Sequence, residues 1–155
     1  MSIFELVESN NLYQVAICDI SDINKMPSSN DMNYPKSYHD ISPLILAAKK
    51  GYIKMAKLLV ARGANVFQKD KCKGTAIYYA ACYNQPEIIE FLIECGAKVN
   101  HKCYNGNTPL MAACCDGINR EAIQMLVKHG ARFNIKNDDE RSVAKRDIMA
   151  HLAMM

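Results

Sequence analysis

The sequence predicts an all-α solenoid, a stack of helix–turn–helix units. A short phrase that contains paired alanines occurs three times, in residues 42–48, 75–81 and 108–113, and its starts lie 33 residues apart. Each copy is followed by a second run with apolar residues at i, i+3 and i+4, which is the spacing of one helix face. A period of about 20–50 residues indicates stacked repeats. One unit cannot bury its apolar face alone, so the units are expected to share a continuous core.

Glycine and asparagine divide each unit into helix, turn, helix and loop. One such residue falls between the two helices of each unit: Gly51, Asn84 and Gly117. A glycine also falls where each second helix is expected to end in the left-handed conformation: Gly63, Gly96 and Gly130. The alanine pairs let neighbouring first helices approach closely. Larger side chains fill the space between the second helices, among them Leu58, Leu59, Phe91, Leu92, Met125 and Leu126.

Length and composition favour a single soluble domain. The chain has 155 residues, a formal net charge of +3 and 23% charged residues, which indicates neither disorder nor a strong nucleic-acid footprint. No apolar stretch approaches the ~20 residues of a membrane span, and Glu5 stands where a secretory signal carries basic residues. The seven cysteines lack C-x-x-C spacing, so we expect reduced thiols and a location in the cytoplasm or nucleus.

The repeated phrases resemble the ankyrin repeat, with its Thr-Pro-Leu-His-x-Ala opening and its Gly-Ala-x-Val-Asn ending. This resemblance implies an ankyrin-repeat solenoid with hairpin-like loops and three full repeats, in residues 37–69, 70–102 and 103–136. Residues 1–36 are then a degenerate N-terminal capping repeat with a long polar loop. Residues 137–155 are a truncated C-terminal cap, in which Ala144, Ile148 and Leu152 keep one helical face.

The copies depart from the family pattern at two positions. Ile45, Tyr78 and Met111 occupy the place of the family's histidine, so the hydrogen bonds of that histidine are absent and a less stable stack or a more apolar groove is expected. Ala76 replaces the proline of the opening phrase. The third unit also has one extra residue within 115–119, which should lengthen its helix–helix turn.

Sequence motifs do not favour an enzyme. The chain has no phosphate loop, dinucleotide fingerprint, H-E-x-x-H zinc motif or G-x-S-x-G elbow. A solenoid surface is also expected to lack an enclosed pocket. Cys95, His101 and Cys103 are the nearest approach to a metal cluster, but their repeat positions should keep them apart. No catalytic residue, metal or cofactor is therefore expected, and a catalytic or metal-binding protein that uses Cys and His residues remains the less favoured alternative.

Protein binding is the favoured function. In ankyrin-type stacks, partners dock in the concave groove formed by the loop tips and the exposed face of each first helix. By register, this resemblance implies the protein-binding residues Lys49, Lys50, Lys69, Lys71, Lys73, Tyr83, Lys102, Tyr104, Asn105, Asn107, Cys115, Asp116 and Lys136.

Charge and aromatic residues sharpen this prediction. Basic residues gather between Lys49 and Lys73, where Asp70 is the single acid. Such a patch is either an ordinary solvated surface or a docking site for an acidic protein segment. Nucleic acid is less favoured because aromatic interleaving is sparse. Tyr83 and Tyr104 are the candidate aromatic anchors of the groove.

The sequence thus predicts a monomeric interaction module that acts as an inhibitor or adaptor, without membrane contact. A viral or bacterial effector directed at host proteins is one interpretation, with a location in the host cell, and a subunit of a larger assembly is another. Asn100 and Asn134 occupy the position at which some ankyrin proteins are hydroxylated. Hydroxylation by a host-type dioxygenase and plain structural hydrogen bonding are the two interpretations of these asparagines.

Overall fold

The computed structural model describes residues 2–19, 21, 23–27, 40–115, 119–143, 148–149 and 153. Within these residues the chain forms helices and no strand. The helices are α1 (Ile3–Glu8), α2 (Leu12–Ile17), α3 (Pro43–Lys50), α4 (Ile53–Ala61), α5 (Ala76–Cys82), α6 (Pro86–Glu94), α7 (Pro109–Cys115) and α8 (Arg120–Lys128). The predicted all-α ankyrin-type solenoid is confirmed.

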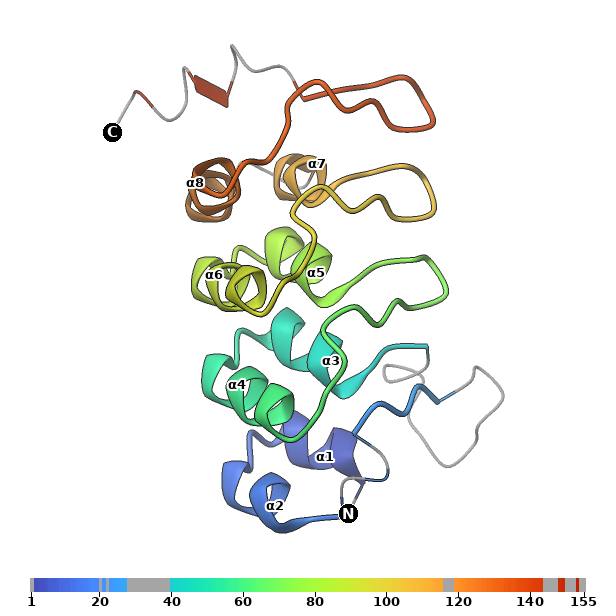
Figure 1. Cartoon of the computed structure of the whole chain (residues 1–155), viewed down its shortest axis with the longest axis vertical. Helices are drawn as coiled ribbons and strands as arrows, with labels where there is room; N and C mark the ends of the chain where they lie inside the picture. Colours follow the sequence, from blue (N-terminus) through green and yellow to red (C-terminus); the bar gives the residue numbers. More distant parts are fainter. Residues whose placement is uncertain are drawn as a thin grey trace.

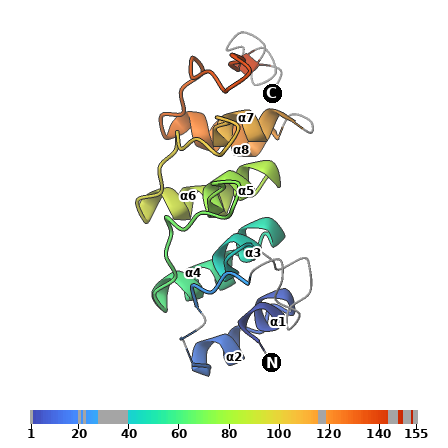
Figure 2. The same ribbon diagram turned by 90° about the vertical axis from the view of Figure 1, so that its right-hand side faces the viewer.

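The helices form two columns along the long axis of the molecule (Figure 1). One column contains α1, α3, α5 and α7, and the other contains α2, α4, α6 and α8. Hairpin-like loops leave α4, α6 and α8 and project to one side, beside the column of α3, α5 and α7 (Figure 1). Turned by 90°, the units lie one above another from the N-terminal to the C-terminal end (Figure 2).

Small and large side chains alternate in the core as the sequence predicts. Ala47, Ala48, Ala80 and Ala81 are fully buried on α3 and α5, which pack against each other. Fully buried leucines fill the second column: Leu59, Leu92 and Leu126. Close contact between the first helices therefore depends on side chains that end at Cβ.

Glycines end the second helices as predicted. Gly63, Gly96 and Gly130 have φ values of 94°, 91° and 86°, in the left-handed region that other residues rarely adopt. After each of them the next backbone N–H turns back to the helix, for example from Ala64 to the carbonyl of Leu59 at 2.9 Å. The last turn of each helix is thereby satisfied before the chain enters its loop.

The starts of the first helices differ from one repeat to the next. The hydroxyl of Ser42 accepts a hydrogen bond from the N–H of Ile45 at 3.3 Å, and the hydroxyl of Thr108 accepts one from Met111 at 3.4 Å. Thr75 occupies the same place at α5, yet its side chain caps nothing. Its hydroxyl oxygen is buried and has no hydrogen-bond partner among the described residues.

The place of the family's histidine is apolar in the outer two copies. Ile45 and Met111 are buried, whereas Tyr78 is half-buried and meets the ring of Tyr79 edge to face at 5.6 Å. The structure thus accommodates the missing histidine with packing. A lower stability of the stack stays a prediction.

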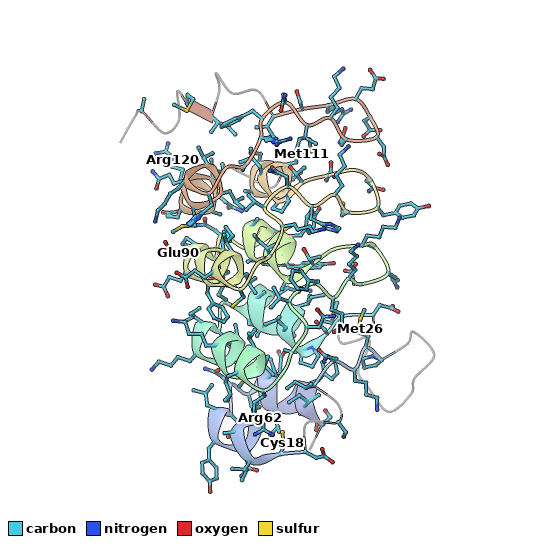
Figure 3. The ribbon with its side chains drawn as sticks, in the orientation of Figure 1. Cys18, Met26, Arg62, Glu90, Met111 and Arg120 are labelled. Carbon is cyan, nitrogen blue, oxygen red and sulfur yellow. The ribbon has the colours of Figure 1, made fainter. Side chains whose placement is uncertain are left out.

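The first two helices are held to the first full repeat by Arg62 at the end of α4. Its guanidinium donates to the carbonyl of Ala16 and, at 2.7 Å, to that of Cys18. Arg62 and Cys18 lie together at the base of the stack (Figure 3). The start of α1 carries a capping box, in which Ser2 and Glu5 each bond the backbone N–H of the other.

Several predicted features lie outside the described residues. These are most of the long polar loop, the extra residue of the third unit and about half of the C-terminal cap. Of the three positions expected on one face of that cap, Ile148 is described and is buried. The boundaries expected for the repeats and caps stay predictions.

The unequal helix caps lead to a stability prediction. Thr108→Val removes a buried cap acceptor and should lower the free energy of unfolding by about 1 kcal/mol. Thr75→Val removes a hydroxyl that bonds nothing among the described residues and should leave the free energy of unfolding unchanged or raise it. Urea denaturation of both variants measures the difference. An equal loss of unfolding free energy in both variants would show that the two hydroxyls stabilise their helices equally.

Candidate protein-binding groove

The loops beside the first column repeat one backbone turn. Its closing hydrogen bond runs from Asp70 N to Gly74 O, from Cys103 N to Asn107 O and from Asn137 N to Arg141 O, at 2.9–3.0 Å. Neighbouring loops are also bonded to each other, since Tyr104 N donates to Cys72 O at 2.7 Å and Asp138 N donates to Asn105 O at 3.1 Å. The loop tips therefore form one continuous surface.

Asp70 organises the first of these loops. Its Oδ1 accepts from the backbone N–H groups of Cys72 and Gly74, both at 2.8 Å, and the Tyr79 hydroxyl donates to its Oδ2. Burial, and then this hydrogen bond to a carboxylate, raise the pKa of Tyr79 above its ordinary value of about 10. Asn137 plays the same part in the last loop, where its Oδ1 accepts from the N–H groups of Asp139 and Arg141.

Two lysines lie over tyrosine rings on this side of the molecule. Lys49 Nζ is 5.7 Å from the ring centroids of both Tyr79 and Tyr83, and Lys73 Nζ is 5.7 Å from that of Tyr104. The side chains of Tyr83 and Tyr104 are 51% and 68% exposed. We call Lys49, Lys73, Tyr83 and Tyr104 the Lys–Tyr face.

Tyr79 connects the two halves of the Lys–Tyr face. Its ring lies beneath Lys49, in the last turn of α3, while its hydroxyl reaches Asp70 at the base of the loop that carries Lys73. The face therefore runs from the ends of the first helices to the loop tips. Neither Lys49 nor Lys73 forms an ion pair with a described residue.

Other predicted groove lysines are already engaged. Lys50 pairs with Glu8 at 2.6 Å. Lys71 pairs with Asp40 at 2.6 Å, and this hydrogen bond raises the pKa of Lys71. Both acids lie outside the basic segment itself, so the sequence overstates the positive charge of that segment.

The third-repeat residues of the predicted groove have mixed roles. Lys102 Nζ donates to the backbone carbonyl of Lys136 at 2.7 Å, and Lys136 lies 3.8 Å from Glu140. Asn107 accepts a hydrogen bond from the amide of Asn137 at 2.7 Å, which turns it toward the loop interior. The remaining predicted residues are exposed: Lys69, Asn105 and Cys115. Asp116 lies outside the described residues.

Sequence reasoning missed the residues that hold the loops in shape. Asp70, Cys103 and Asn137 occupy one repeat position, and the turn closes four residues later in each case. A polar Asx residue at a fixed repeat position was the available signal for Asp70 and Asn137. Asp40 carried no such signal, because its partner Lys71 belongs to the next loop.

The asparagine at the end of a unit clamps the following unit. Asn100 Oδ1 accepts from the N–H of Arg132 at 2.9 Å, and its Nδ2 donates to the carbonyl of Gly130 at 3.2 Å. Asn24 makes the same two bonds, with Asn65 N at 2.7 Å and Gly63 O at 3.2 Å. We call this pair of bonds the asparagine clamp.

The seven cysteines are free thiols. Burial raises the pKa of Cys114 to about 11, so this thiol stays protonated and weakly nucleophilic at neutral pH. In the described part of the chain, no three His, Cys, Asp or Glu side chains are placed to hold a metal ion. No helix in that part is long and apolar enough to cross a membrane.

Open cavities lie between the loops and the first helices of neighbouring units. A cavity of about 450 Å³ lies where the loops after α4 and α6 approach the start of α5. Another of about 440 Å³ lies between α7 and the loop after α8, and Met111 and Ile148 contribute to its wall. Periodicity predicts the average unit, whereas these cavities depend on side chains in which neighbouring units differ.

Comparison with known proteins identifies the family. A family profile described as "Ankyrin repeats (3 copies)" matches residues 44–137, more than half of the chain. The chain belongs to the ankyrin repeat family. Ankyrin repeats are protein–protein interaction modules, and the family is generally non-enzymatic.

Several relatives contain a similar stretch. Ankyrin repeat and SOCS box protein 11 of Danio rerio is 36% identical over 102 residues, covering 65% of this chain and 34% of that protein. The Mus musculus protein of the same name is 32% identical over 101 residues, covering 65% and 31%. Putative ankyrin repeat protein FPV031 of Fowlpox virus is 32% identical over 101 residues, covering 63% and 29%. The chain thus matches about a third of the length of these relatives.

The raised pKa of Tyr79 leads to a pH prediction. Tyr79→Phe should lower the free energy of unfolding by about 1–2 kcal/mol near pH 8, because the Asp70 carboxylate loses a hydrogen-bond donor. Above about pH 10 the unfolded tyrosine releases its proton while the folded one retains it, so the free energy of unfolding of the wild type falls. The gap between wild type and Tyr79→Phe should therefore narrow from pH 8 to pH 11 in urea denaturation. A constant gap would show that Tyr79 titrates normally.

Exposure separates the two asparagines considered for hydroxylation. Asn134 is exposed, whereas the Asn100 amide is held by the asparagine clamp. We therefore expect a host-type asparaginyl dioxygenase to add one oxygen atom at Asn134 in preference to Asn100. Intact-mass measurement with peptide mapping tests this, with Asn134→Ala as the control. An unchanged mass would dismiss the modification.

Proposed function

We propose that this protein binds an acidic segment of a partner protein through the Lys–Tyr face. The observation that carries the proposal is the placement of Lys49 and Lys73 over tyrosine rings, with no ion pair to any described residue. Their ammonium groups are thus available to carboxylates, unlike those of Lys50 and Lys71.

The chemistry of this face fits such a partner. A lysine held over an aromatic ring loses less freedom on binding than a lysine in open solvent. Tyrosine offers a rigid ring for apolar side chains and a hydroxyl for hydrogen bonds, which makes it a frequent interface anchor. Positive charge along the face would also speed the approach of an acidic segment.

We propose that the protein acts by binding its partner and that it catalyses no reaction. A monomeric chain in the cytoplasm or nucleus would block a partner, as an inhibitor, or bridge two proteins, as an adaptor. The names of two relatives combine ankyrin repeats with a SOCS box, and another similar protein comes from a poxvirus. This resemblance supports an adaptor or a host-directed effector as the finer form of the proposal, without a catalytic residue, a metal or a membrane.

Charge reversal on the Lys–Tyr face tests the proposal. Lys49→Glu combined with Lys73→Glu should lower the affinity for a captured partner protein at least ~10-fold, because two attractive contacts become repulsive. The matched control reverses Lys54 and Lys57 on α4, in the other column of helices. Affinity is measured by titration at two salt concentrations, and added salt should weaken the wild-type complex.

The aromatic part is tested separately by Tyr83→Ala and Tyr104→Ala. Each should cost about 1–2 kcal/mol of binding free energy if the ring is an anchor. Unfolding curves of all variants provide the folding control. Equal binding by the Lys49/Lys73 and Lys54/Lys57 reversals would exclude the Lys–Tyr face as the docking surface.

A further inference from the structure

The cavity of about 450 Å³ lies apart from the Lys–Tyr face. Val66 and Phe67 come from the loop after α4, Ala97 and Lys98 come from the loop after α6, and Thr75 precedes α5. Tyr83 caps the opposite end of α5. The volume falls within the range of about 300–1,000 Å³ that small-molecule sites occupy.

The cavity is located where the asparagine clamp is missing. Phe67 has the repeat position of Asn24 and Asn100, the two residues that form the clamp at other boundaries. Its ring is 54% exposed and cannot bond the backbone of Gly96 and Lys98, to which no described side chain is hydrogen-bonded. The two units therefore lack both hydrogen bonds of the asparagine clamp at this corner of the stack.

The second unusual residue of the same corner is Thr75. It lines the cavity, it is 6% exposed, and its hydroxyl oxygen has no hydrogen-bond partner in the described chain. The equivalent Ser42 and Thr108 both use their hydroxyls to cap their helices. A buried hydroxyl without a partner is costly, so a hydrogen-bonding atom of a ligand in the cavity would relieve that cost.

Apart from the Thr75 hydroxyl, the wall of the cavity combines apolar side chains with basic ones. Val66, Ile77 and Ala97 are buried and supply the apolar wall. Lys69 and Lys98 are exposed and form no ion pair with any described residue.

His101 is the third basic residue of the wall, and its ring is oriented by a hydrogen bond between Nε2 and the carbonyl of Lys73 at 2.9 Å. The nearby Asp70 does not line the cavity, and its two carboxylate oxygens accept three hydrogen bonds from Cys72, Gly74 and Tyr79.

We infer that this cavity is a binding site for a small organic anion with an apolar body. The body lies against Val66, Phe67 and Ile77, the anionic group lies between Lys69, Lys98 and His101, and a polar atom of the ligand bonds the Thr75 hydroxyl. No side chain of the Lys–Tyr face lines the cavity, and the two surfaces meet only where His101 bonds the backbone carbonyl of Lys73. The site would allow a metabolite to bind the stack while the protein-binding face remains free.

Simple probes test the anionic and apolar parts together. The probes are 4-phenylbutyrate and octanoate, with 4-phenylbutyramide and octanamide as uncharged controls. Binding is followed by amide NMR shifts of the full chain labelled with ¹⁵N. We expect saturable shifts at Val66, Thr75, Ala97 and Lys98 with the carboxylates, and at least ~10-fold weaker binding of the amides. Equal binding of acids and amides, or shifts centred on Tyr83 and Tyr104, would overturn the assignment.

Three variants and one control variant test where the probes bind. The double variant Lys69→Gln/Lys98→Gln should lower the affinity for the carboxylate probes about 10-fold, and Thr75→Val should lower it about 5-fold. The control variant Thr108→Val should leave this affinity unchanged. Phe67→Asn should restore the asparagine clamp, abolish probe binding and raise Tm by about 3 °C. A loss of binding with a gain in stability separates the site from a folding defect. Unchanged probe binding by the Lys69/Lys98 and Thr75 variants would refute it, whatever the behaviour of Phe67→Asn.

Discussion

The close contact between α3, α5 and α7 is the constraint on which the rest of the structure depends. Fully buried alanines on α3 and α5, among them Ala47 and Ala80, allow the helix backbones to approach across each repeat boundary. A larger side chain there would separate two units, because the packed core has little room to absorb extra atoms. Since each unit buries its apolar face only against its neighbours, a change in spacing at one boundary would pass to the loops on both sides.

The stack also creates the surface features on which binding depends. Lys49 belongs to α3, whereas the tyrosine rings beneath it belong to the following repeat. The position of Tyr104 relative to the previous loop is fixed, because its backbone N–H donates a hydrogen bond to the carbonyl of Cys72 in that loop. The Lys–Tyr face therefore exists only between units, and no isolated unit would present it. Packing at each repeat boundary therefore determines both the stability of the stack and the shape of the binding surface.

Differences between the copies have the opposite effect at one corner of the boundary between the first two full repeats. Where Asn24 and Asn100 join one unit to the next through two backbone bonds, Phe67 offers a ring. Where Ser42 and Thr108 cap a helix, the hydroxyl of Thr75 is left without a partner in the described chain. Both substitutions give up stabilising bonds, and both line one cavity. Departures from a repeat pattern that share a location are characteristic of functional sites, which often retain locally unfavourable interactions.

The sequence by itself determined the all-α repeat fold, because helix periodicity, glycine stops and alanine pairs are local signals that recur every 33 residues. It also placed Tyr83 and Tyr104 correctly at exposed positions, since their repeat register is unambiguous. Only the tertiary structure decided which lysines are available. Glu8 and Asp40 neutralise Lys50 and Lys71 from positions 42 and 31 residues away, a separation that no local pattern encodes. The cavity beside Thr75 was equally hidden from the sequence, because an unpaired hydroxyl or a missing clamp can be recognised only once the neighbouring unit is in place.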